Sequence, residues 1–487
     1  MPEQQETKKR RRRRPRARTA TLLLAYAALA MERADAALLP SVYREIGAAL
    51  QASPSALGSI ALSRSVVQAA CYPLAAYLAA RHDRLTVVAL GAFLWAAATL
   101  LIAMAVTAAL NGVGLALQIP AIYAFVADSV DGTSRGVAFG WLMVAGKVGT
   151  VGGTSLGLLM APTSFLGIPG WRLAFLLLAA AGAAVGVSIR SFAAGNDAAA
   201  AASTTTATKP VRQELQEFAR EAKAVLRVPS FQVMVAQGLT GSFPWSALSF
   251  TAMWLELVGF SHGETAALMA LFKVATSLGA LLGGKMGDAL ARRFKNSGRI
   301  VLAQISSGSA VPLAAVLLLA LPSDPPATAK HGAALFTLGL MASWNPSSTN
   351  GPILAEIVPP RSRTSVYALD RTCEAVLASF APTVVGVLAE RLYGYELAGG
   401  AAVEAERRNA ASLARALYTA IAVPMVLCCL VYSFLYCTYP RDRETAARAE
   451  AAAAAAAARG DGGARSDGGE GSDSEDEGED ERKLLPK

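Results

Sequence analysis

The sequence predicts an all-α membrane protein with about twelve transmembrane helices, built as two pseudo-repeated six-helix bundles. Of its 487 residues, 53% are hydrophobic and only 17% are charged, whereas soluble domains typically carry about a quarter charged residues. Apolar stretches long enough to cross a bilayer, roughly twenty residues each, recur along the chain. Two motifs of the first half return in the same order in the second half, which is typical of transporters built from repeats.

The apolar stretches define the predicted spans, because charged residues, prolines and glycines interrupt the hydrophobic sequence between them. In the first half they are residues 20–40, 56–80, 86–106, 108–127, 136–160 and 171–190. In the second half they are 231–257, 264–287, 300–321, 332–357, 364–390 and 414–437. The implied organisation is a basic arm (1–19), an N-terminal half (20–190), a linker with one surface helix (191–230), a C-terminal half (231–438) and an acidic tail (439–487).

Charge is concentrated at the two ends of the chain. Residues 1–19 contain nine Lys or Arg, and residues 460–487 contain ten Asp or Glu. The net charge of +9 therefore describes the ends and not a nucleic-acid-binding face. The tail is expected to be disordered after the alanine run at residues 449–458, because Gly, Ser and acidic residues bury too little apolar area to offset the entropy lost on ordering.

The distribution of bases also predicts the orientation in the membrane. Short loops on the side of the N-terminus hold nine bases and those on the opposite side hold five, which places both termini in the cytoplasm. A competing interpretation of the first apolar run, residues 22–31, is a cleavable signal peptide. Against it, apolar sequence resumes at residues 36–40 and completes a full span.

Several patterns that resemble catalytic motifs have simpler explanations. Gly153 to Gly157 fits the G-x-S-x-G of serine hydrolases but lacks the preceding strand and a histidine partner. Together with Gly149, these glycines recur every four residues, which predicts close approach of another helix. The Gly-rich run ending at Lys285 lacks the Ser or Thr of a phosphate-binding loop. The five cysteines have no metal-ligand spacing. The sequence therefore predicts neither an enzyme nor an ATP-driven pump, and no metal or organic cofactor.

The internal repeat lies in the loops that follow the second and fourth spans of each half. Ala127-Asp128 and then Arg135 match Ala355-Glu356 and then Arg363, and the segment ending in Arg81 and Arg84 matches the one containing Asp288 and Arg292. We interpret these loops as gating loops, and their charged residues are Arg81, Arg84, Asp128, Arg135, Asp288, Arg292, Glu356 and Arg363.

At these loops the sequence resembles the major facilitator superfamily, as it does at Gly170-Trp171-Arg172 and Phe175. Residues 31–35 (MERAD) and 71–77 (CYPLAAY) resemble the spinster-like branch found in plants and algae. The resemblance covers roughly residues 20–440 and implies a carrier that works by alternating access. Spinster-like relatives imply a lipid-like or amphipathic organic solute.

The sequence departs from the family pattern at two positions. Ala80 stands where the family places an aspartate, and Ala108 stands where the fourth span usually carries an arginine. The junction between the third and fourth spans is also short, since Ala80 to Asp128 is 48 residues whereas Asp288 to Glu356 is 68. These departures leave open a second interpretation, a non-transporting receptor or scaffold on the same fold.

Ionisable residues within the spans are the candidate coupling sites, because a charge inside the membrane is costly and normally faces a cavity or a partner. The first span contains Glu32, Arg33 and Asp35, and the eleventh contains Asp370, Arg371 and Glu374. We predict that these residues couple transport to protons, with Glu32 as the leading proton carrier. The alternative for each group is an ion pair that holds helices together.

The predicted substrate cavity involves a broken tenth span. Residues 345–352 contain two prolines, which remove backbone donors and free carbonyl groups that lipid cannot satisfy. Such a break normally lines a cavity, and an isolated cation in the fifth span could bind an anionic group of the solute. The predicted cavity residues are Lys147, Trp344, Asn345 and Asn350.

The sequence thus predicts a secondary transporter for a small organic or lipid-like solute, proton-coupled or facilitative, with no cofactor beyond the proton as candidate coupling ion. Residues 480–485 fit an acidic dileucine signal, so a sorting adaptor that binds Leu484 and Leu485 is a candidate partner. This signal favours an endosomal or vacuolar membrane over the plasma membrane.

Overall fold

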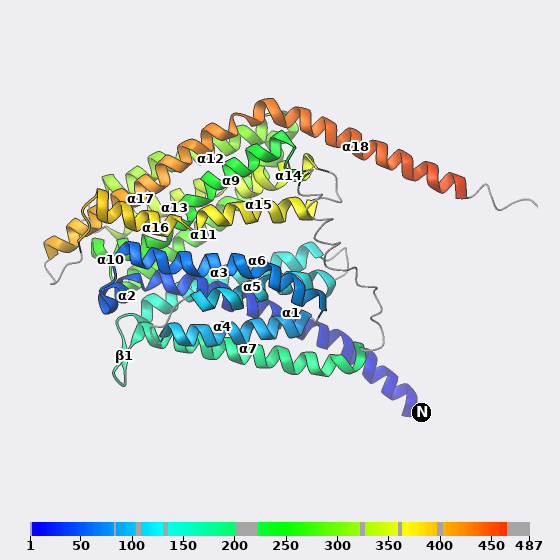
Figure 1. Ribbon diagram of the computed structural model, residues 1–487, viewed down its shortest axis with the longest axis horizontal. Helices are drawn as coiled ribbons and strands as arrows, with labels where there is room; N and C mark the ends of the chain where they lie inside the picture. The colour runs from blue at the N-terminus through cyan, green and yellow to red at the C-terminus, as the bar shows by residue number, and fades with distance from the viewer. Residues whose placement is uncertain are drawn as a thin grey trace, which may run out of the picture.

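The computed structural model describes residues 2–81, 84–103, 109–129, 135–200, 223, 225–321, 327–358, 363–396 and 403–464. Its helices form two layers that lie side by side (Figure 1). A short antiparallel hairpin, β1 (Ser164–Phe165) with β2 (Ile168–Pro169), joins two helices of the first layer. The predicted all-α membrane fold is confirmed.

The first layer is the N-terminal half of the chain. It contains α1 (Pro2–Ser41), α2 (Tyr43–Leu50), α3 (Pro54–Arg81), α4 (Arg84–Ala103), α5 (Ala109–Ser129), α6 (Arg135–Met160) and α7 (Gly170–Ala200). The second layer is the C-terminal half, and several of its helices are interrupted by 3-10 or π turns. It contains α9 (Pro229–Ala247), η1 (Leu248–Phe250), α10 (Thr251–Val258), α11 (His262–Arg293), α12 (Gly298–Ala315), η2 (Val316–Ala320), α13 (Thr328–Ala342), η3 (Pro346–Asn350), α14 (Gly351–Glu356), α15 (Arg363–Ala378), α16 (Ala381–Val387), η5 (Leu388–Leu392), α17 (Val403–Tyr432) and α18 (Leu435–Ala464).

Within the described residues, each predicted span falls on one of these helices or on a run of consecutive ones. Within the described ranges, seven stretches are long and apolar enough to cross a membrane by length and composition. Helices suit this environment because every backbone donor and acceptor is paired within the helix itself. The start of α1 and α18 lie at one end of the bundle, here called the proximal end (Figure 1). The opposite end, with α2, the hairpin and α10, is called the distal end.

Two segments outside the predicted spans are more helical than expected. Helix α7 continues to Ala200, ten residues into the predicted linker, and residues 201–222 and 224 of that linker lie outside the described residues. Helix α18 continues to Ala464, so the first part of the predicted tail, residues 439–464, is helical. This stretch includes an alanine run, and alanine has the highest helix propensity of any residue. Residues 465–487 are outside the described part of the chain.

The glycines of α6 pack directly against α1, as their four-residue spacing predicts. A methyl group on Gly149 would collide with the backbone of Ala30, and one on Gly153 would collide with the backbone of Ala34. At Gly157 the obstacle is the hydroxyl of Ser41. Absence of a side chain at these positions lets the two backbones touch, and this contact fixes the depth of α1 in the bundle.

This packing predicts opposite effects for neighbouring glycines of α6. Gly153→Ala is expected to destabilise the protein by about 1–3 kcal/mol, because the obstacle is backbone and cannot rotate away. Gly152→Ala should be neutral or slightly stabilising, because nothing lies within 4 Å of the added carbon and alanine is the better helix former. The midpoint of thermal unfolding and the yield of monodisperse protein measure both. Equal effects of the two substitutions would contradict direct contact between Gly153 and the backbone of α1.

Candidate functional site

A cavity of about 460 Å³ lies between the two halves. Helices α1, α2, α3 and α6 line it from the first half, and α9, η1, α10, α11 and α16 line it from the second. Much of its wall is apolar, with Trp245, Leu248, Met269 and Phe272 on the side of the second half. A cavity of this size at the repeat interface matches the usual position and volume of a solute site.

The charged groups that line this cavity are all basic. Arg33 reaches it from α1 and Lys273 from α11, so the two cations come from opposite halves. The described lining contains no Asp or Glu. Lys273 forms no ion pair within the described residues, and its ammonium group lies 5.6 Å from the ring centroid of Phe272. The cavity therefore presents a positive charge from each half within a wall that mixes apolar side chains with Ser, Thr and Tyr hydroxyls.

A buried cluster of acids and bases lies on the α1 side of the cavity. Arg33 Nε is 3.1 Å from a carboxylate oxygen of Glu32, and only 3% of the Glu32 side chain is exposed. Asp35 pairs with Arg64 of α3 at 3.4 Å and accepts a hydrogen bond from Thr99 of α4 at 3.1 Å. The structure thus brings the three predicted residues of the first span together, with Arg33 joining the cluster to the cavity.

The predicted group in the eleventh span lies elsewhere, inside the second half. Asp370 and Glu374 are buried on α15, and Glu374 packs against Gly238 of α9. Neither residue lines the cavity. The Arg371 side chain is outside the described part of the structure. Among the described side chains of the two groups, only those of the first span therefore adjoin the cavity in this conformation.

The broken tenth span is also packed within the second half instead of lining the cavity. Asn345 donates a hydrogen bond to Ser307 at 2.8 Å, and Asn350 accepts one from Tyr432 at 2.7 Å. Trp344 is buried, and Lys147 is exposed on α6. None of these four predicted residues lines the cavity in this conformation. Polar side chains of the break bond to α11, α12 and α17, although Asn345 Oδ1 is buried with no hydrogen-bond partner among the described residues.

Part of the predicted gating loops forms a network at the proximal end of the second half. Arg299 pairs with Asp288 at 3.0 Å and lies 3.8 Å from Glu356. Glu356 also pairs with Arg443 at 3.4 Å and accepts a hydrogen bond from Tyr439. These contacts tie α11, α12, α14 and α18 together.

The remaining predicted gating residues are not part of this network as far as the structure describes them. Arg292 is exposed near the end of α11. For the others the side chains are outside the described part of the structure: Arg81, Arg84, Asp128, Arg135 and Arg363.

Three of these functional positions were not predicted as sites. Arg64 and Lys273 are single charges within predicted spans, which is a signal that the sequence contains. Their partners and surroundings come from other helices, so sequence spacing could not connect them to Asp35 or to the cavity. Arg299 lies in the short loop between two predicted spans, and the structure shows that it joins two predicted gating residues, Asp288 and Glu356.

Polar contacts join the two halves at the distal end. Glu390 accepts hydrogen bonds from the backbone nitrogen and the hydroxyl of Ser55, at 2.6 and 2.9 Å. Arg44 pairs with Glu406 at 2.5 Å. Burial raises the pKa of the nearby Glu45 carboxyl above its ordinary value and raises the pKa of Tyr395 to about 12. The halves are thus held together on this side of the cavity.

The family model of the Major Facilitator Superfamily matches residues 21–382. The chain belongs to the major facilitator superfamily. No curated protein matches the sequence significantly. Membership of the superfamily indicates a transporter and not an enzyme, and the predicted resemblance is confirmed.

Solved structures of transporters share this fold at low sequence identity. A bacterial homologue of the human lysosomal transporter Spinster, inward-facing and unoccupied, has a TM-score of 0.72 and 17% identity, with 88% of this chain and 98% of that chain covered. Its occupied inward-facing form has a TM-score of 0.70 and 18% identity, with the same coverage. A D-xylose–proton symporter has a TM-score of 0.58 and 15% identity, with 81% and 96% covered. At these identities the likeness is one of fold.

The buried pair of Asp35 and Arg64 predicts strong coupling between the two positions. Arg64→Met should lower stability by about 3–5 kcal/mol, because it leaves the buried Asp35 carboxylate without its cation. Asp35→Asn combined with Arg64→Met should recover much of that loss, since neither charge remains. Thermal unfolding of both single variants and the double variant measures the coupling. Additive losses would show that the pair is not coupled.

Proposed function

We propose that the protein is a secondary transporter that moves an organic anion with an apolar body by alternating access. The observation that carries this proposal is the cavity between the halves, whose charged lining residues are Arg33 and Lys273. Their cations favour a carboxylate, sulfate or phosphate group, and Arg is suited to two parallel hydrogen bonds with such a group. The apolar wall formed by Trp245 and Phe272 suits the rest of the solute.

Alternating access is supported by the way the two cations are mounted. Arg33 belongs to one half and Lys273 to the other, so rocking of one half against the other changes the distance between them. A solute anion between them would interact with both cations only when the halves are close. The contacts of Ser55 with Glu390 and of Arg44 with Glu406 would break when the distal end opens.

Proton coupling through Glu32 is part of this proposal. The Glu32 carboxylate pairs with Arg33, and Arg33 lines the cavity. Protonation of Glu32 would break its ion pair with Arg33 and free Arg33 to bind the solute anion. Deprotonation of Glu32 would restore the ion pair and release the anion. Solute binding and proton binding would then favour one another, and this mutual dependence is what coupling requires.

The anion hypothesis predicts a selective effect of Lys273→Gln. Loss of a charge-assisted contact worth about 1.5–3 kcal/mol should raise KM for an anionic solute roughly tenfold or more. Neutral analogues should be transported equally by the variant and the parent protein. Uptake into proteoliposomes of paired anionic and neutral amphiphiles measures the difference.

Lys330→Gln is the matched control for Lys273→Gln. It removes an exposed lysine at the start of α13, which does not line the cavity. Its KM should be unchanged. Equal KM of Lys273→Gln and the parent protein for every anion that the parent transports would overturn the proposed role of the cavity.

The coupling hypothesis is tested by Glu32→Gln, which keeps the shape of the side chain but removes its charge change. Exchange of solute without a pH gradient should persist, and accumulation driven by a pH gradient should fail. If Glu32 serves only as the partner of Arg33, the variant should lose folded protein and keep its pH dependence. The yield of monodisperse protein and gradient-driven uptake are measured together.

Glu404→Gln, which removes an exposed carboxylate at the start of α17, is the control for loss of one acidic group. A well-folded Glu32→Gln variant that accumulates solute with unchanged pH dependence excludes Glu32 as the proton carrier. Asp370 or Glu374 would then be tested in the same way.

A further inference from the structure

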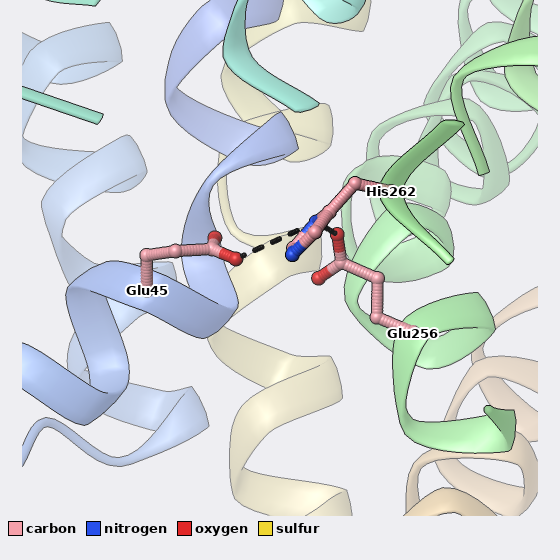
Figure 2. Close-up of side chains that lie close together, drawn as sticks. All are labelled: Glu45, Glu256 and His262. Carbon is pink, nitrogen blue, oxygen red and sulfur yellow. Dashed lines mark hydrogen bonds and ion pairs between the residues drawn. The ribbon is translucent and has the colours of Figure 1, made fainter. Parts of the chain in front are cut away.

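Three side chains from both halves of the protein meet at the distal end, apart from the cavity. Glu45 lies on α2, Glu256 on α10 and His262 at the start of α11. Figure 2 shows the Glu45 carboxylate facing the His262 ring from one side, with the Glu256 carboxylate on the other. His262 Nδ1 is 2.7 Å from Glu256 Oε1 and 3.8 Å from Glu45 Oε1. One ligand atom of each residue lies within 4.8 Å of the other two.

The turn between α10 and α11 holds two of these residues in place. Gly259 ends α10 with a φ of 110°, a conformation that side chains other than glycine rarely adopt. Ser261 then caps α11 by accepting a hydrogen bond from the Glu264 backbone, while the Glu264 side chain accepts one from the Ser261 backbone. Both ends of this turn are therefore fixed. The backbone already holds Glu256 and His262 facing each other, so it need not rearrange to bring them together.

Both carboxylates have an oxygen that the described residues do not satisfy. Glu256 is only 2% exposed, and its Oε2 is buried without a hydrogen-bond partner in the described part of the chain. Glu45 Oε2 is buried in the same way, again with no partner among the described residues. A buried carboxylate oxygen without a partner is costly. The cluster therefore has acceptor capacity that a bound cation would use.

The surrounding charges leave this acidic character intact. The only basic side chain that contacts the cluster within the described ranges, other than His262, is that of Arg44, which donates to the Glu256 carbonyl oxygen at 3.3 Å. The Arg44 guanidinium also pairs with Glu406 at 2.5 Å, so its charge is already matched. The carboxyl groups of Glu45 and Glu256, when ionised, then place two negative charges beside the His262 ring. A divalent cation would balance both.

We propose that Glu45, Glu256 and His262 form a binding site for a divalent transition-metal ion, with zinc as the most suitable probe. An imidazole nitrogen with two carboxylates is a ligand set that zinc accepts at about 2.0–2.2 Å, with further positions left for water. The imidazole favours a transition metal over calcium or magnesium, which prefer oxygen ligands alone. Small side-chain movements bring the present separations to those of a bound ion.

The position of this site gives it a regulatory consequence, which rests on the proposed alternating-access function. Glu45 belongs to the first half, whereas Glu256 and His262 belong to the second. Opening of the distal end would separate Glu45 from the other two ligands and break the site. A bound ion therefore stabilises the conformation that is closed at the distal end and slows transport.

Metal binding is measured on the purified full-length protein, independently of transport. The protein is purified without a histidine tag, stripped with a chelator and titrated with zinc by calorimetry, with magnesium for comparison. One zinc ion per chain should bind and raise the midpoint of thermal unfolding. Glu45→Gln, Glu256→Gln and His262→Gln should each weaken zinc binding at least tenfold, because even loss of an outer-shell group typically costs 10–100-fold.

Glu404→Gln is the matched control, since Glu404 is an exposed carboxylate at the start of α17 and outside the cluster. Its zinc affinity should equal that of the parent protein. Absence of zinc binding to the parent, or binding that none of the three ligand substitutions weakens, overturns the proposal. X-ray absorption of the zinc-loaded parent requires no variant and covers the case in which a ligand variant does not fold. It should show nitrogen and oxygen ligands, and sulfur ligands would assign the ion to cysteines and overturn the site.

The regulatory consequence is tested by adding zinc to proteoliposomes that transport an amphiphilic anion. Zinc should inhibit the parent protein, and Glu45→Gln should relieve that inhibition at least tenfold in zinc concentration. Unchanged transport by a zinc-loaded parent overturns the regulatory consequence but not the site. Zinc binding that follows the ligand substitutions in a protein without transport activity would confirm the site and reject the proposed function, so the two failures are distinguishable.

Discussion

Direct contact between the backbones of α1 and α6 is the constraint on which the geometry of the cavity depends. Gly149 and Gly153 leave no side chain between the helices, so Ala30 and Ala34 sit against α6. This contact sets the position of Glu32, Arg33 and Asp35, which lie between and beside those alanines in sequence. In a lipid environment the hydrophobic effect between helices is weak, and such close packing supplies much of the association.

Acidic and basic side chains near the cavity occupy different positions. Acidic groups of the first span are buried behind the cavity, where Glu32 pairs with Arg33 and Asp35 pairs with Arg64. The charged residues that line the cavity, Arg33 and Lys273, are both basic. Buried charges are retained in proteins when they are paired or when they serve a ligand. Lys273, which has no carboxylate partner in the described structure, fits the second case.

The distal end combines a polar interface with the metal-ligand cluster. Ser55, Arg44 and Glu45 of the first half meet acidic residues or His262 of the second half. Interactions of this kind are favourable but reversible, which suits the opening and closing of this interface that the proposed alternating access requires. At the proximal end, by contrast, Arg299 and Glu356 connect helices within one half. That half can therefore move as a unit while the interface changes.

The sequence by itself determined the helices, because hydrophobic length and turn residues act locally along the chain. It also determined the family, the repeat, and the contact of Gly149, Gly153 and Gly157 with another helix, since a four-residue period places them on one face. It also indicated Glu32, Arg33 and Asp35 as candidate functional residues, because charged side chains within a membrane span are energetically costly. Tertiary structure alone decided that Lys273 and Arg33 share a cavity, that Arg64 is the partner of Asp35, and that Glu45 meets Glu256 and His262. These pairs are brought together by the packing of helices distant in sequence, and residue spacing along one helix carries no information about the side chains of another.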